Sequence, residues 1–71
     1  MTVGTIKRLI RDRGFGFILP DGAAEEVFFH SSAVENPTFD ELNEGQQVEF
    51  ETEPDPRQPN RSRAVHVHQV G

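Results

Sequence analysis

Apolar and polar residues alternate along this chain in short stretches, and helical periodicity is weak throughout. Stretches rich in Val, Ile, Phe and Thr recur between groups of Gly, Pro, Asn and Asp, which is typical of short β-strands joined by turns. Pro20-Asp21-Gly22 and Asn43-Glu44-Gly45 have the composition of tight turns, and Ser31 is expected to begin a single helical turn. We expect five strands, at residues 3–11, 15–20, 26–30, 46–53 and 63–70.

Five short antiparallel strands leave exposed edges unless the sheet closes on itself. The sequence therefore predicts the all-β class, with the strands forming a five-stranded antiparallel barrel. If Ile6 faces inward, the period of two along each strand places one face of every strand in the interior. The predicted core is Ile6, Ile18, Val27, Phe29, Val48, Phe50, Val65 and Val67.

Aromatic side chains occupy the opposite face of two neighbouring strands. Residues 13–18 read Arg-Gly-Phe-Gly-Phe-Ile and residues 27–30 read Val-Phe-Phe-His, so Phe15, Phe17 and Phe28 share a face with His30. Exposed rings next to basic groups are suited to stacking on unpaired bases while the cations meet phosphates. The opposite interpretation, in which these rings fill the core and the valines and isoleucines face out, stays open at this point. The residues expected to contact nucleic acid are Lys7, Arg13, Phe15, Phe17, Phe28 and His30.

The same segments resemble the bacterial cold shock proteins over nearly the whole chain. The resemblance rests on Arg13-Gly14-Phe15-Gly16-Phe17-Ile18, on Val27-Phe28-Phe29-His30, and on Phe39 before Leu42-Asn43-Glu44-Gly45-Gln46. It implies a five-stranded OB-fold-type barrel that binds single-stranded RNA or DNA with low sequence selectivity and acts as an RNA chaperone. It also adds Phe39 to the expected contact surface, although packing of Phe39 on the barrel as a loop anchor is an equal alternative.

Three positions depart from the family pattern. Arg8 stands where the family typically has a stacking tryptophan, Leu9 replaces a second aromatic residue, and Ser31 replaces the aromatic after the motif histidine. Each base stacked on an aromatic ring contributes roughly 1 to 3 kcal/mol, so these losses predict weaker binding. The guanidinium of Arg8 can lie on a base and adds a charge, which predicts stronger salt dependence and adds Arg8 to the expected contacts.

Charge is unevenly distributed over a chain with a net charge of −5. Residues 1–20 and residues 56–71 each carry +3, whereas residues 21–55 hold 11 carboxylates and no base. If the two ends meet in space, they form a basic face on an acidic body; otherwise the split reflects solvated surfaces. Arg61 and Arg63 fit either interpretation. With 71 residues, the chain is expected to form one domain over residues 1–71.

Several classes of function are disfavoured by the composition. The chain has no cysteine, and no serine or threonine has an assignable catalytic partner, so we expect neither an enzyme nor a cofactor. His66 and His68 are two residues apart, but no third metal ligand is assignable, so no metal is expected. No apolar run is long enough to span a membrane, and a cytoplasmic location is expected. The alternative function is a protein-interaction module or homodimer built on the same barrel.

Overall fold

The computed structural model describes residues 1–36 and 38–70. Its strands are β1 (Thr2–Ile10), β2 (Phe15–Pro20), β3 (Val27–His30), β4 (Val34–Asn36), β5 (Gln47–Pro54) and β6 (Ser62–Gln69). Two single 3₁₀ turns, η1 (Ser31–Ala33) and η2 (Phe39–Glu41), lie on either side of β4. Within the described residues, no helix is long and apolar enough to cross a membrane. The five expected strands are present with boundaries within one residue, and the short strand β4 is additional.

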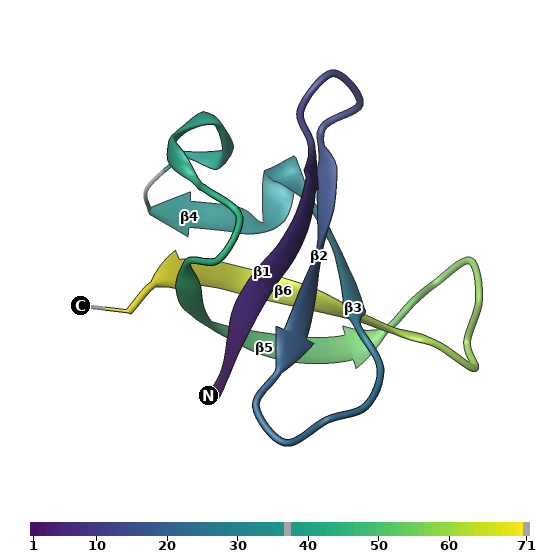
Figure 1. Cartoon of the computed structure of the whole chain (residues 1–71). Coiled ribbons are helices and arrows are strands. Elements are labelled where there is room, and N and C mark those ends of the chain that lie inside the picture. Colours follow the sequence, from purple (N-terminus) through teal and green to yellow (C-terminus); the bar gives the residue numbers. More distant parts are fainter. Residues whose placement is uncertain (37, 71) are drawn as a thin grey trace.

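The strands close into a barrel through pairing between distant parts of the chain. β1 pairs antiparallel with β2 on one edge and β5 on the other, β2 pairs with β3, and β5 pairs with β6. β3 and β6 then pair in parallel and close the ring, while β4 adds to β6 in parallel. Figure 1 shows β5 and β6 running across the β1–β2 hairpin, as in a small barrel. The predicted fold class is confirmed, and the parallel pairing at the closure was not predicted.

The barrel interior is filled by the predicted face of the strands. Fully buried side chains include six of the eight predicted core residues, namely Ile6, Ile18, Phe29, Val48, Phe50 and Val67. Val27 is half-buried and packs against this core. Phe39, Leu42 and Ala64 complete the buried cluster. Because Ile6 and Ile18 are paired directly across β1 and β2, the inward assignment of Ile6 sets the face of β2 and of β1 up to the extra residue Lys7, beyond which the faces of β1 exchange.

Val65 is the one predicted core residue that neither belongs to the buried cluster nor packs against it. The pairing of β5 with β6 shifts register between Glu49 and Glu51, so that β6 carries one extra residue at this point. His66, directly after Val65, has a φ of 52°, the left-handed conformation that relieves such a bulge. The extra residue breaks the alternation of inward and outward side chains. Ala64 therefore takes the core position expected for Val65, and Val67 stays in the core as predicted.

Candidate nucleic-acid interface

Five outward-facing residues form a row that crosses the barrel strands. Arg8 on β1 pairs with Phe17 on β2, and Phe17 pairs with Phe28 on β3. Phe28 is level with Arg63 on β6, which is in turn level with Glu53 on β5. Side chains that are directly opposite in neighbouring strands share a face, so these groups lie side by side. We call this set, Arg8, Phe17, Phe28, Arg63 and Glu53, the outer row.

The rings of Phe15, Phe17 and Phe28 form a contacting cluster on this face, which we call the aromatic face. Their centroids are 6.0 Å apart for Phe15 and Phe17, 5.5 Å for Phe15 and Phe28, and 6.0 Å for Phe17 and Phe28. Edge-to-face and tilted contacts of this kind stabilise aromatic pairs and fix ring orientation. All three rings are half-buried, and none belongs to the core cluster. The interpretation in which these rings fill the interior is therefore wrong.

The backbone beneath the rings explains why they face outward. Gly16, between Phe15 and Phe17, faces inward and is level with Leu9 on β1 and Phe29 on β3. A Cβ at Gly16 would lie 2.6 Å from the carbonyl oxygen of Arg8 and 2.8 Å from the Phe29 ring. The ring of Phe29 thus occupies the space that a side chain at position 16 would need. Only glycine at this position lets the inner layer close while Phe15 and Phe17 remain on the outer face.

His30 is exposed at the end of β3, opposite Phe15 on β2. Its Nδ1 accepts a hydrogen bond from the backbone N–H of Ser32 at 3.2 Å and lies 3.0 Å from the Ser32 hydroxyl oxygen, so the imidazole caps η1. A neutral imidazole that accepts at Nδ1 carries its proton on Nε2. His30 is therefore held in one orientation with an N–H donor directed away from the cap.

The basic residues expected at the site lie around the aromatic face. Lys7 is the extra residue where the register of β1 and β2 shifts, and it is exposed, as is Arg8. Arg13 is exposed in the turn before Phe15, where Gly14 at a φ of 76° reverses the chain. Lys7, Arg8 and Arg13 thus lie on β1 or the turn that follows it, near the rings of β2.

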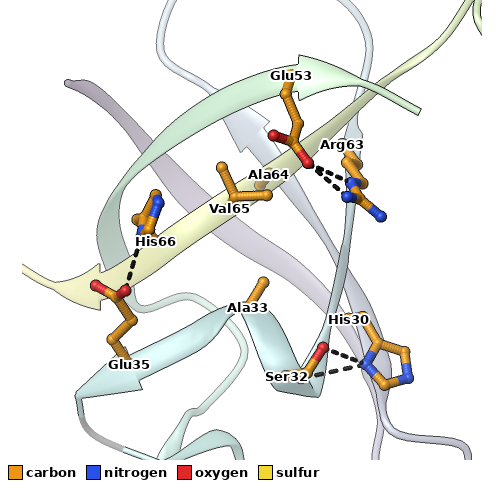
Figure 2. A pocket seen from close by; sticks show the side chains of 9 residues that line it. All are labelled: His30, Ser32, Ala33, Glu35, Glu53, Arg63, Ala64, Val65 and His66. Atoms are coloured by element: carbon orange, nitrogen blue, oxygen red, sulfur yellow. Dashed lines mark hydrogen bonds and ion pairs between the residues drawn. The ribbon is translucent and has the colours of Figure 1, made fainter. Parts of the chain in front are cut away.

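Arg63 joins the outer row although its sequence context did not identify it as a site residue. Its Nε donates to Oε1 of Glu53 at 2.9 Å, and its Nη2 is 2.5 Å from the same oxygen, as Figure 2 shows. Arg8 from one basic end of the chain and Arg63 from the other share this face, but the rings of Phe17 and Phe28 separate them, and β6 pairs with β3 of the middle segment. However, Glu53 from the acidic middle segment meets there too, so the face is not purely basic. Arg63 lies beside Phe28 only because β3 and β6 pair in parallel, and no local sequence pattern predicts that pairing.

Phe39 does not lie on the aromatic face. It is 7% exposed and its ring centroid is 5.9 Å from that of Phe29 inside the barrel. Residues three apart in a 3₁₀ turn lie on the same side, and η2 accordingly directs both Phe39 and Leu42 into the core. The alternative expectation, a loop anchor packed on the barrel, describes this position, and the assignment of Phe39 to the contact surface is corrected.

Leu9 also belongs to the inner layer, where it packs against the core. An aromatic residue at position 9 would extend from the same inward position opposite Gly16. The replacement of an aromatic residue by leucine here therefore removes no ring from the outer face. The departures that alter this face are Arg8 and Ser31.

A shallow groove continues from Phe17 and Phe28 toward two loops. It runs between the segment after β2, including Ala23 and Glu26, and Arg61 at the end of the loop before β6. The ring edges suit flat bases and the guanidinium suits a phosphate, whereas the carboxylates of Glu25 and Glu26 on the same lining oppose a charged backbone. The groove extends the aromatic face beyond the strands.

His66, at the bulge of β6, pairs with Glu35 on β4 through Nδ1 and Oε2 at 2.6 Å. His68 does not join it, because its Nδ1 lies 3.2 Å from the backbone oxygen of His66. Across residues 1–36 and 38–70, no group of three His, Cys, Asp or Glu side chains is arranged to hold a metal. The hydrogen bond with Glu35 and its negative charge raise the pKa of His66 above 6.5, against a small opposing effect of burial.

The His66–Glu35 pair predicts a pH dependence of stability. Because the pKa of His66 is raised in the folded state, its stabilisation is complete below pH 6.5 and is lost as the pH rises through the raised value. We expect an imidazole pKa above 6.5 by NMR titration and a lower thermal midpoint at pH 8 than at pH 6. In Glu35→Gln, most of the rise in pKa and of this pH dependence should disappear, and the charges of Glu51 and Glu53 should maintain the remainder. An identical pKa in the variant would contradict the assignment.

Comparison with known proteins supports the same architecture. The family model for the 'Cold-shock' DNA-binding domain matches residues 2–70. The major cold shock protein of Micrococcus luteus is 44% identical over 57 residues, 80% of this chain and 85% of that protein. Cold shock-like protein CspA of Stigmatella aurantiaca is 47% identical over 57 residues, 80% and 84% of the two chains.

A further relative and a solved structure agree. Cold shock-like protein CspG of Escherichia coli K12 is 42% identical over 62 residues, 87% of this chain and 89% of that protein. The structure of Drosophila Unr CSD456 superimposes with a TM-score of 0.77 at 27% identity, over 99% of this chain. This chain spans about a quarter of the length of that structure, 26%. On these matches and on its barrel, the chain belongs to the 'cold-shock' DNA-binding domain family.

Proposed function

We propose that this protein binds single-stranded RNA or DNA by stacking unpaired bases on the aromatic face. The single observation that carries the proposal is the cluster of Phe15, Phe17 and Phe28 on the outside of a barrel whose core is already filled. Exposed contiguous rings are unfavourable in water unless a partner covers them. Every base has a flat π-face, so stacking tolerates most sequences.

The outer row supplies the charge that such a ligand requires. Arg8 lies at one end of the two central rings and Arg63 lies at the other, so cations flank the stacking surface. Guanidinium groups contact phosphates and also stack on bases. The curated relatives carry cold shock names, and members of this family bind nucleic acid, which supports the same ligand class for this chain.

The proposed activity is non-enzymatic and requires only occupancy. By binding unpaired nucleotides and releasing them quickly, the protein lowers the population of hairpins, as an RNA chaperone does. Duplexes are poor ligands on this account, because their bases are already stacked on each other. We propose that residues 1–71 act as one cold shock domain, without a cofactor, in the cytoplasm.

A titration of labelled oligothymidine of seven nucleotides, read by fluorescence anisotropy, tests the proposal. We expect saturable binding at low salt that weakens at moderate salt. A hairpin with seven nucleotides in each strand of its stem should bind much more weakly, because its bases are paired and stacked. The chain has no tryptophan, so the label is placed on the oligonucleotide. No binding at low salt would reject the proposal. If the protein then also dimerised in sedimentation experiments, the interaction-module alternative would be favoured.

Reversing the charge of Arg8 predicts a change in salt dependence. Arg8→Glu should weaken binding and reduce the slope of log affinity against log salt by about 0.7 to 1, the value for one lost phosphate contact. Arg8→Lys is the matched control, because it keeps the charge and removes the planar guanidinium, and it should retain the slope. Parallel titrations at three or more salt concentrations measure both quantities. An unchanged slope in Arg8→Glu would mean that Arg8 does not contact the strand.

A further inference from the structure

A hollow of about 300 Å³ lies beside His30, between η1 and β6. Its floor is formed by the apolar side chains of Ala33 and Val65 and by β6 at Ala64, whose own side chain faces the core, and Figure 2 shows the polar groups arranged around them. The volume lies at the lower end of the range for small-molecule sites. A flat heteroaromatic ring lying on this floor would have its edge directed at the surrounding polar groups.

One wall of the hollow is the Arg63–Glu53 pair. Both contacts from Arg63, through Nε and Nη2, end on Oε1 of Glu53. Oε2 of Glu53 and Nη1 of Arg63 have no hydrogen-bond partner among residues 1–36 and 38–70. The pair therefore leaves Oε2 of Glu53 free to accept a hydrogen bond, while the third guanidinium nitrogen of Arg63 points away from Glu53, as Figure 2 shows. The side chain of Glu53 is 44% exposed and that of Arg63 is 39% exposed.

The opposite wall is fixed by the His66–Glu35 pair. His66 is held by its 2.6 Å contact to Glu35 and by the bulge that sets its backbone. Figure 2 shows the imidazole of His66 turned toward Glu35 and away from Arg63. The hollow thus has one occupied wall and one wall with free hydrogen-bonding groups.

The outer row leads into this hollow. Phe28 is level with Arg63, and His30 lies on the rim. A strand whose base stacks on Phe28 or His30 therefore places a neighbouring base within reach of the hollow. The aromatic face cannot distinguish bases, because stacking uses the π-face that all of them share. Edge recognition in single strands requires polar groups placed as they are at this wall.

We propose that the hollow is a subsite for one base of the bound strand and that it prefers guanine; this proposal rests on the proposed function. Guanine offers two adjacent donors, N1–H and N2–H, to Oε2 of Glu53. Hydrogen bonds to a carboxylate are stronger than neutral ones. Thymine and adenine lack two adjacent donors. Cytosine gives the carboxylate one amino group and covers less of the apolar floor than a purine.

The test is a scan of heptanucleotides in which one thymine of oligothymidine is replaced by guanine, adenine or cytosine at each position in turn. We expect guanine at one position to tighten binding about 5- to 30-fold, with no comparable effect of adenine or cytosine. Glu53→Gln should abolish this preference and, by removing a negative charge, tighten binding to unsubstituted oligothymidine. Glu51→Gln is the matched control, with the same change on the same strand at a residue outside the hollow, and should retain the preference.

The outcomes separate this proposal from the proposed function. Failure of every oligonucleotide to bind rejects both. Binding of oligothymidine with no tighter guanine position, or with cytosine or adenine as tight as guanine, overturns the subsite and leaves the stacking function standing. A guanine preference that survives Glu53→Gln overturns it as well. Far-UV circular dichroism of each variant shows whether the fold is kept.

Discussion

Phe29→Ala is expected to lower the free energy of unfolding by about 3 to 5 kcal/mol. Phe29 is 0% exposed, contacts the ring of Phe39 and fills the space above Gly16. Removing the ring therefore leaves a cavity that three separate elements border. A chain of this length has a total stability of about 4 to 10 kcal/mol. We expect much of the variant to be unfolded at 25 °C in the absence of ligand.

Urea unfolding followed by far-UV circular dichroism measures this loss, since the chain has no tryptophan to report by fluorescence. Phe29→Leu is the control, because it keeps most of the buried volume and should cost clearly less than the alanine variant. A loss below about 1 kcal/mol for Phe29→Ala, the typical cost of a point mutation, would mean that this ring is not part of the core.

Phe28→Ala is expected to have the opposite profile, with the fold retained and binding to single strands weakened by about 1 to 3 kcal/mol, roughly 5- to 150-fold. Phe28 is adjacent to Phe29 in the chain, but its ring contacts Phe15 and Phe17 on the outer face. Its removal exposes two neighbouring rings and does not open the core. Anisotropy titration with oligothymidine measures the affinity, and circular dichroism verifies the fold.

Phe28→Leu is the informative control for this position. Leucine keeps an apolar side chain on the outer face but has no ring to stack, so its binding should resemble that of the alanine variant. Binding as tight as the parent protein's would show that apolar contact, and not stacking, holds the ligand. Unfolding of Phe28→Ala would show that the ring supports the barrel and would contradict its placement on the outer face.

The fold was largely predictable because alternation and turn composition are local signals. Five strands and six core residues follow from period two and from the inward placement of Ile6. The exchange of Val65 for Ala64 was not predictable, since it depends on one extra residue at His66. A single inserted residue reverses the faces of everything beyond it. Phe39 was placed on the contact surface by the resemblance alone, and a single three-residue turn is too short for the sequence to show which side of it is buried.

The candidate site was predictable within each hairpin and not across the closure. The antiparallel register of β2 with β3 follows from the turn between them, so the cluster of Phe15, Phe17 and Phe28 could be anticipated. Arg63 lies beside Phe28 only because β3 and β6 pair in parallel at a long separation in sequence. The energy of the whole barrel sets that register. Glu53 likewise reaches this face only through the pairing of β5 with β6, which places it opposite Arg63.

The most direct test of the central claim is the ring-proton NMR spectrum of the six phenylalanines with and without oligothymidine. Stacked bases shift nearby protons through their ring currents. We predict large shifts confined to Phe15, Phe17 and Phe28, with Phe29, Phe39 and Phe50 nearly unchanged. Saturable binding that leaves the first three rings unshifted, or that shifts the buried three to the same degree, would contradict the account.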